Sequence, residues 1–173
     1  MTNDDRTTSN PTDGDTTQLV TVVTTQPDSA SGPSRETDGP GVLERLGDTD
    51  LSPADPNLDI RGRTVTDRHG DDIGHVTGLL IDRGERRVRF LEVGAGGFLG
   101  LGERHFLVPV EAVTAVGDDR VRIDRTREHV TGSPAYDPQL TRRTREDYAS
   151  SYGYYGLMPY WEAGYVYPAV PLL

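Results

Sequence analysis

Short apolar runs separated by turn residues fill the middle of the chain, and they constrain the fold more than any other feature. Between residues 60 and 124, apolar side chains alternate with polar ones over short stretches. An alternation of period two is typical of strands with one buried face, and Gly and Asp between the runs favour tight turns. We predict strands over residues 64–66, 73–82, 87–93, 105–116 and 120–124.

Several short strands joined by tight turns form a meander, and a meander hides its edges best by curling into a closed barrel. The predicted fold class is therefore all-β, with a small β-barrel over residues 59–134. Pro109 lies inside a predicted strand but cannot donate a backbone hydrogen bond, which indicates an edge or rim position. After the barrel, one helical turn is expected at residues 126–130.

Residues 1–58 differ sharply in composition from the rest of the chain. They contain eleven Asp and Glu but three Arg, so most of the net charge of −10 lies there. Low hydrophobicity combined with high net charge predicts a disordered acidic tail.

Two apolar islands interrupt the tail. Residues 18–25 are β-prone and able to pair transiently with a strand edge. Residues 41–47 are either a short docking motif or, as we favour, a collapsed spot in the tail.

Aromatic residues concentrate in the C-terminal region, residues 135–173. All eight tyrosines lie between residues 136 and 167, together with the one tryptophan. We expect a short helix over residues 140–152, with Tyr148 and Tyr152 on one face. This arm wraps its own barrel, clasps a second copy or binds another protein, because Tyr and Trp provide large contact areas at low entropic cost. Its candidate partner-binding residues are Tyr152, Tyr154, Tyr155, Tyr160 and Trp161.

The glycine-rich stretch 94–102 invites comparison with phosphate-binding loops. It completes neither the Gly-x-Gly-x-x-Gly nor the Gly-Lys-Ser/Thr pattern, and it leads into a strand instead of a helix. We interpret it as a flexible turn. Phe98 and Leu99 at its tip are further candidate partner-binding residues, although they are equally suited to capping the end of the barrel.

No grouping of residues in the sequence predicts catalysis or metal binding. The four histidines show no ligand spacing, the paired acids lie in predicted turns, and the chain contains no Cys. Glu92 lies in a strand among apolar residues; a buried acid is one interpretation, and a side chain pointing away from the barrel is favoured. We therefore expect no enzymatic activity, no metal and no cofactor.

The stretch from residue 60 to about residue 140 resembles the PRC-barrel family, named after the photosynthetic reaction centre. Gly70 and the run 73–82 fit its Ile-Gly-x-Val-x-x-Leu-Leu-x-Asp pattern, and residues 96–100, 108–110 and 134–137 fit its later motifs in order. The residues that carry the resemblance as structural positions are Gly70, Gly74, Asp82, Gly96, Gly97 and Pro109.

The resemblance implies a small barrel used for protein–protein contact, as in the cytoplasmic domain of the H polypeptide of the photosynthetic reaction centre and in a ribosome-maturation factor. We therefore expect a non-enzymatic adaptor module. The alternatives are an RNA- or ribosome-associated accessory factor and an electron-transport accessory protein at a membrane surface. The acidic charge speaks against nucleic-acid binding, and no run of residues is apolar enough to span a membrane. The expected location is the cytoplasm, with a possible homodimer.

Overall fold

The computed structural model describes residues 43–53, 58–96, 102–139 and 143–169, which contain a sheet of eight strands. The strands are β1 (Glu44–Arg45), β2 (Thr64–Thr66), β3 (Asp72–Asp82), β4 (Arg87–Ala95), β5 (Arg104–Pro109), β6 (Val113–Val116), β7 (Arg120–Ile123) and β8 (Ala135–Tyr136). The helical elements are the 3-10 turns η1 (Leu46–Asp48) and η3 (Val110–Ala112) and the α-helices α1 (Arg127–Thr131) and α2 (Arg145–Tyr155).

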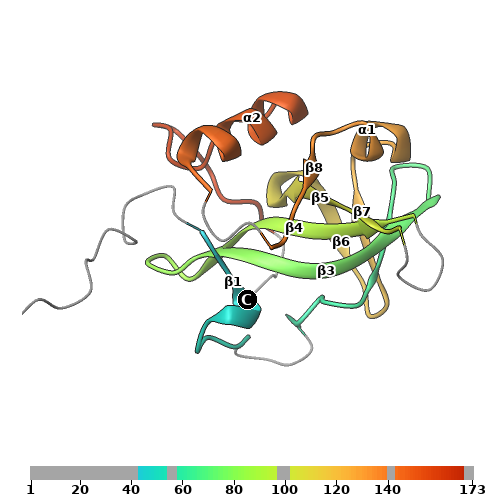
Figure 1. Ribbon diagram of the computed structural model, residues 1–173, viewed down its shortest axis with the longest axis horizontal. Coiled ribbons are helices and arrows are strands. Elements are labelled where there is room, and N and C mark those ends of the chain that lie inside the picture. Colours follow the sequence, from blue (N-terminus) through green and yellow to red (C-terminus); the bar gives the residue numbers. More distant parts are fainter. Residues whose placement is uncertain (1–42, 54–57, 97–101, 140–142, 170–173) are drawn as a thin grey trace, which may run out of the picture. The chain divides into compact units, whose positions relative to one another are not determined.

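The strands follow the order β6-β7-β2-β3-β4-β5-β8, and β1 pairs with β3 away from this path. The antiparallel meander β3-β4-β5 is the centre of the sheet, and its two long strands are prominent in Figure 1. β2 runs parallel to β7 and antiparallel to β3. The predicted strands at 64–66, 73–82, 87–93 and 120–124 are confirmed, with small shifts at their ends.

The predicted continuous strand 105–116 is wrong. β5 ends at Pro109, the chain makes the 3-10 turn η3, and β6 starts as a separate strand. The turn redirects the chain so that β6 pairs with β7 instead of extending β5. Pro109 itself pairs with Phe90 of β4, whereas β8 pairs with His105 and Phe106 alone, so no described strand faces the other side of the proline.

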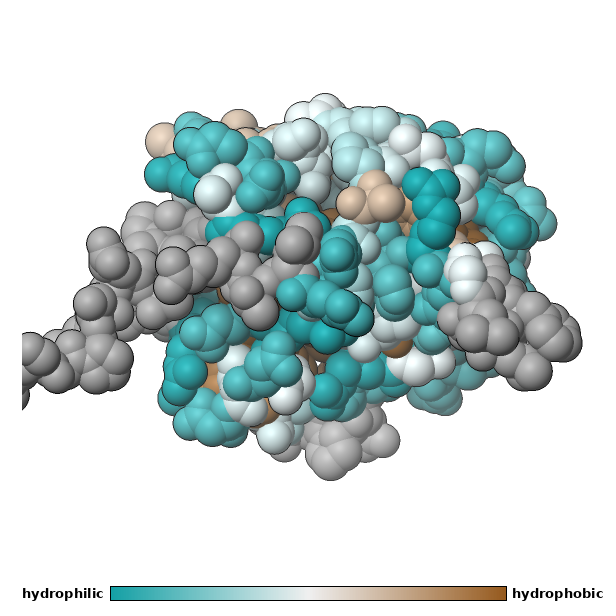
Figure 2. Space-filling view, in the orientation of Figure 1, coloured by the Kyte–Doolittle hydropathy of each residue, from teal (hydrophilic) through white to brown (hydrophobic). Residues whose placement is uncertain are grey.

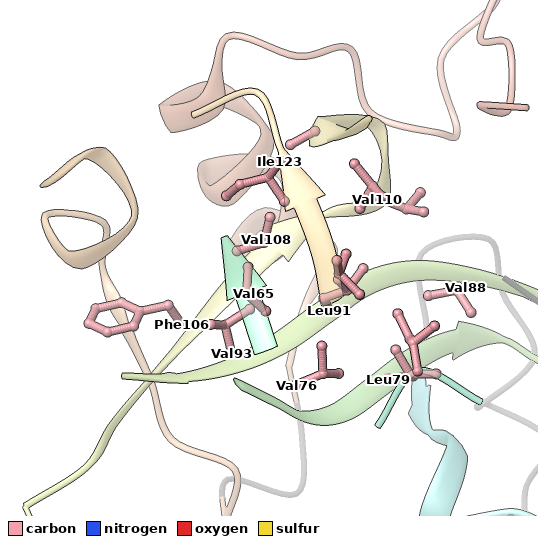
Figure 3. Close-up of a cluster of buried hydrophobic side chains, with 14 of the residues drawn as sticks. Val65, Val76, Leu79, Val88, Leu91, Val93, Phe106, Val108, Val110 and Ile123 are labelled. Carbon is pink, nitrogen blue, oxygen red and sulfur yellow. The ribbon is translucent and has the colours of Figure 1, made fainter. Parts of the chain in front are cut away.

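Aliphatic side chains from strands distant in this order share one core (Figure 3). Val65 and Ile123, from β2 and β7, lie in the same buried cluster as Leu91 and Val108, from β4 and β5. The sheet must therefore curve around these side chains. Among the described strands, no pair joins β6 to β8, so the pairing pattern supports an all-β sheet without establishing a closed barrel.

Both helices begin at threonine caps. The Thr126 hydroxyl accepts a hydrogen bond from the backbone N–H of His129, which confirms the helical turn expected there. Thr144 and Asp147 form a capping box that starts α2, and Gly156, in the left-handed region at φ 65°, ends it. The predicted helix 140–152 is therefore displaced toward the C-terminus, and residues 140–142 lie outside the described residues.

Part of the predicted disordered tail belongs to the folded domain. Residues 43–53 are ordered against the sheet: β1 pairs with β3, and the side chain of Leu46 is 2% exposed. The interpretation of residues 41–47 as a collapsed spot is wrong for the described part, because Glu44 and Arg45 form a strand and Leu46 begins a 3-10 turn. Residues 1–42, including the island at 18–25, lie outside the described residues.

Candidate functional site

The meander β3-β4-β5 has two covered faces, which we call inner and outer. The inner face packs Leu91 and Val93 into the aliphatic core, whereas Phe90, which points the opposite way, belongs to a second buried cluster. The outer cluster contains Leu80, Phe90, Leu107, Tyr136, Tyr148, Tyr152 and Tyr160. In Figure 1, α2 lies at the upper left, above the sheet in this view, and two of its tyrosines contact Phe90 of β4.

Glu92 lies two residues beyond Phe90 on the outer face and is fully buried. Its carboxylate accepts hydrogen bonds from the Arg45 guanidinium, at 2.7 Å, and from the Thr77 hydroxyl, at 3.0 Å. The Nδ1 atom of His105 lies 3.4 Å away. The side chain points away from the inner core, as favoured, yet it is buried because β1 and neighbouring strands cover it. A buried carboxylate needs such partners, since desolvation otherwise disfavours its charge.

A row of polar side chains continues from Glu92 across the three strands. His75, Gly94 and His105 are direct cross-strand neighbours on β3, β4 and β5. A Cβ atom at Gly94 would lie 1.8 Å from the Glu103 carboxylate, so the glycine leaves the space that this side chain occupies. One oxygen of Glu103 lies 3.8 Å from Nε2 of His75 and 3.9 Å from Nε2 of His105.

The row contains hydrogen-bond donors and acceptors, and its side chains become more exposed from Glu92 through His105 to His75. The side chain of His75 is 48% exposed, that of His105 is 25% exposed and that of Glu92 is 0% exposed. In the ranges that the structure describes, no three His, Asp or Glu side chains are placed to hold a metal ion. The row is a polar surface beside one buried ion pair, Arg45 with Glu92, to which the Thr77 hydroxyl is hydrogen-bonded.

The aromatic half of the outer face is formed by the C-terminal arm. Phe90 stacks on Tyr148, with ring centroids 5.5 Å apart, and packs against Tyr152 at 4.9 Å. Trp161 meets Tyr152 and Tyr160 edge to face, at 5.8 and 5.0 Å. Offset and edge-to-face ring pairs of this kind stabilise packing beyond the area that they bury.

Arg89 holds the segment after α2 against β4. Its side chain is 1% exposed, and its guanidinium lies over the Tyr160 ring, 4.2 Å from the ring centroid. It also donates to the Tyr165 hydroxyl, at 3.4 Å, and pairs with Glu85 at 2.5 Å. A desolvated arginine over a tyrosine ring is a favourable cation–π contact, so Arg89 links the arm to the sheet.

Glu111 completes this attachment from the turn η3. Its carboxylate accepts hydrogen bonds from the hydroxyls of Tyr165, at 2.5 Å, and Tyr152, at 3.4 Å. Burial raises the pKa of Glu111 above its ordinary value, although the Tyr165 hydrogen bond opposes the shift. Burial also raises the pKa of Tyr152 and Tyr165, and the neighbouring carboxylate adds to both shifts.

The structure separates the predicted partner-binding residues into three groups. Tyr152, Tyr155 and Tyr160 are buried, at 0%, 3% and 7% exposure, so the expectation that they face a partner is corrected: they pack within the protein itself. Tyr154 is 38% exposed and Trp161 is partly exposed. Phe98 and Leu99 lie outside the described residues.

The motif glycines occupy positions where a side chain would interfere. Gly70 and Gly96 have φ angles of 95° and 78°, in the left-handed region that favours glycine. A Cβ atom at Gly74 would lie 1.9 Å from the backbone carbonyl oxygen of Gly94, so glycine permits the close approach of β3 and β4. Asp82 accepts a hydrogen bond from the backbone N–H of Glu85 and thereby fixes the β3–β4 turn. Gly97 lies outside the described residues.

Arg45, Arg89 and Glu111 were missed by sequence reasoning, although they organise the outer face. Their partners are distant in the chain: Arg45 and Glu92 are 47 residues apart, and Glu111 and Tyr165 are 54 residues apart. Arg89 gave no local signal, because it stands at a polar position of the alternation Arg87-Val88-Arg89-Phe90. No local signal identifies Arg45, which stands in a segment with tail-like composition.

Three findings complete this geometry, two of them from comparison with known proteins. No curated protein matches the chain. Among the described residues, no helix has the length and apolar character needed to cross a membrane. The family model of the PRC-barrel domain matches residues 58–130, which contain the meander and all of the inner core except Leu46 and Tyr155. The chain therefore carries a PRC-barrel domain over residues 58–130.

Proposed function

We propose that this chain is a non-enzymatic interaction module in which the PRC-barrel domain supports a protein-binding surface on the C-terminal arm. The observation that carries the proposal is where exposed apolar side chains occur. Among the described residues, the large hydrophobic side chains that remain exposed are Tyr154, Met158 and Val166, and all three lie in the arm. Exposed apolar groups that a protein retains in one region are typical of contact surfaces.

The arm is fixed to the domain, which favours binding. Tyr148, Tyr152 and Tyr160 are buried against the sheet, and the Tyr154 hydroxyl donates to the backbone carbonyl of His129. A surface held in one conformation loses little entropy when a partner binds. Met158 adds an unbranched, polarizable side chain that adapts to different partners.

Figure 2 shows one face of the molecule. Teal hydrophilic residues predominate on it, and brown atoms appear in small separate areas between them. We further infer that the sheet closes into a barrel through side-chain packing, since Val113 of β6 and Phe106 of β5 belong to one buried cluster. A closed barrel would present a rigid support for the arm.

The test compares the full chain with a variant that carries Tyr154→Ser, Met158→Ser and Val166→Ser. The matched control carries Thr114→Ser, Asp118→Ser and Arg122→Ser, at exposed positions of the domain. Photo-crosslinking in cell extract with mass spectrometry, together with sedimentation analysis, reports protein partners and self-association. We expect the arm variant to lose at least about tenfold in captured partner, as for central interface residues, and the control to behave as wild type. Equal capture and equal oligomeric state in all three proteins would refute the proposal.

A further inference from the structure

A segment outside the matched domain, residues 43–51, packs along the edge of β3. We call the surface that it covers, from Leu80 and Ile81 of β3 to Glu92 of β4, the groove. β4 pairs with Leu80 and Ile81 on one side of β3, so β1, which pairs with the same two residues, lies on the other side. The contact is a short added strand, with Glu44 opposite Ile81 and Arg45 opposite Leu80. Peptide ligands that add a strand to a sheet edge bind in this way.

Arg45 pairs with a buried acid at this edge. Its guanidinium lies 2.7 Å from the fully buried carboxylate of Glu92. Gly78 lines the approach: a Cβ atom there would lie 2.9 Å from Glu92 and 3.3 Å from the Arg45 guanidinium. One carboxylate oxygen of Glu92 accepts from Arg45, whereas the other is buried without a hydrogen-bond partner among the described residues. A buried carboxylate of this kind favours a cation beside it.

Leucines provide the second kind of contact. Leu46 is 2% exposed and belongs to the inner core, while Leu43 packs against the outer cluster and Leu51 against the inner one. Arg83 adds exposed ion pairs to Glu44, at 3.3 Å, and to Asp50, at 2.9 Å. Exposed pairs contribute little, so the recognition rests on the backbone pairing, the arginine and the leucines.

We propose that this groove is a binding site for extended peptide segments of the pattern Leu-x-Arg-Leu, and that residues 43–46 are its resident ligand. The resident segment already makes the contacts that such a peptide would make. Its arginine pairs with Glu92, its second leucine packs in the inner core, and its backbone pairs with β3. The proposal extends the interaction role proposed above to a partner class, and it uses a different surface from the exposed residues of the arm.

The small contact makes exchange feasible. The segment is held by two paired residues, one buried ion pair and a few apolar side chains, so its release is a local event. The tether gives the resident segment a high effective concentration, and a partner must therefore compete with it. A partner peptide gains access when the resident segment is weakened or when the peptide concentration is high.

The test uses the full chain and a fluorescent peptide with the sequence of residues 43–51. Fluorescence anisotropy is measured with wild type, with Arg45→Ala and with Arg45→Ala combined with Glu92→Gln. We expect the peptide to bind Arg45→Ala at least tenfold more tightly than wild type, whose groove is occupied. Glu92→Gln should abolish this gain, and a peptide with alanine in place of its arginine should not bind any variant.

Circular dichroism verifies that each variant folds. If Arg45→Ala unfolds, Leu46→Ala weakens the same segment through its other anchor, and the same gain in binding is expected. Dissociation of a wild-type dimer by the peptide would identify a second copy as the occupant of the groove. Binding that is equal in wild type and the weakened chains, or that does not change with Glu92→Gln, would overturn the proposal. The arm variant tested above retains this groove, so the two proposals fail independently.

Discussion

The two faces of the central meander are covered by different parts of the chain. Every member of the inner cluster except Leu46 and Tyr155 belongs to residues 58–130, the matched PRC-barrel domain. In the outer cluster, Leu80, Phe90 and Leu107 come from that domain, whereas the other members are tyrosines of the arm. The domain therefore supplies its own inner core but leaves its outer face to be completed by the segments around it.

The residues that match the family model are therefore fewer than the residues that pack together as one folded unit. β1 and the arm lie outside the matched residues, yet they bury Glu92, Arg89 and Phe90. A domain cut at residues 58 and 130 would expose an apolar and charged face to water. Exposed surface of this kind is typical of a binding site or of an aggregation-prone fragment.

The largest expected effect tests whether the outer face contributes as much stability as the inner one. Tyr152→Ala removes a fully buried ring from the outer face, and Leu91→Ala removes a fully buried side chain from the inner face. Each deletion leaves a cavity, so we expect losses of about 3 to 5 and about 2 to 5 kcal/mol in the free energy of unfolding. Chemical denaturation measures both. A loss below about 1 kcal/mol for Tyr152→Ala would show that the arm is only loosely attached.

The next effect compares a glycine between two strands with a glycine of the covering helix. Gly74→Ala places a methyl group against the backbone carbonyl of Gly94, and the strands must separate to admit it. We expect a loss of about 3 kcal/mol from this overpacking. Gly153→Ala in α2 is the matched control. Apart from the backbone of α2 and the neighbours of Gly153, no atom of the described residues lies within 4 Å of the added carbon, so improved helix propensity should raise stability by up to about 1 kcal/mol. Thermal unfolding of both variants distinguishes the outcomes, and equal melting temperatures would contradict the close approach of β3 and β4.

The smallest effect concerns the response of the outer face to alkaline pH. Burial raises the pKa of Tyr148 and Tyr152 above the ordinary tyrosine value of 10. Above pH 10 the unfolded chain loses these protons while the folded chain keeps them, so stability must fall as the pH rises. The slope is about 1.4 kcal/mol per pH unit for each such group. Tyr152→Phe keeps the ring but lacks the ionisable hydroxyl, so it should lower the slope by the contribution of one group. Chemical denaturation at several pH values measures the slope. An unchanged slope would mean that Tyr152 ionises as readily in the folded protein as in the unfolded one.

Local sequence rules predicted most of the strands because their information is local. Alternation located β2, β3, β4 and β7, and turn residues such as Gly70 and Asp82 marked their ends. The rules failed at residues 105–116, where an apolar run continues through a turn. There the pairing of β6 with β7, and not the hydropathy of the run, decides where β5 stops.

The candidate site was less predictable than the fold. The sequence singled out the tyrosines of the arm by residue type, but residue type does not reveal which of these side chains are buried. Tyr154 stayed exposed while its neighbour Tyr155 became buried, because adjacent residues of α2 face different directions.

An all-β domain, its turns and the match of residues 58–130 to the PRC-barrel family follow from short-range patterns in the sequence. The burial of Glu92, its pairing with Arg45 and the covering of the outer face by the arm arise only when the chain is folded. These outcomes depend on contacts between residues far apart in the chain, such as Arg45 with Glu92 and Arg89 with Tyr165, 47 and 76 residues apart. Whether a side chain is buried depends on all the segments that pack around it, so a short stretch of sequence does not determine it.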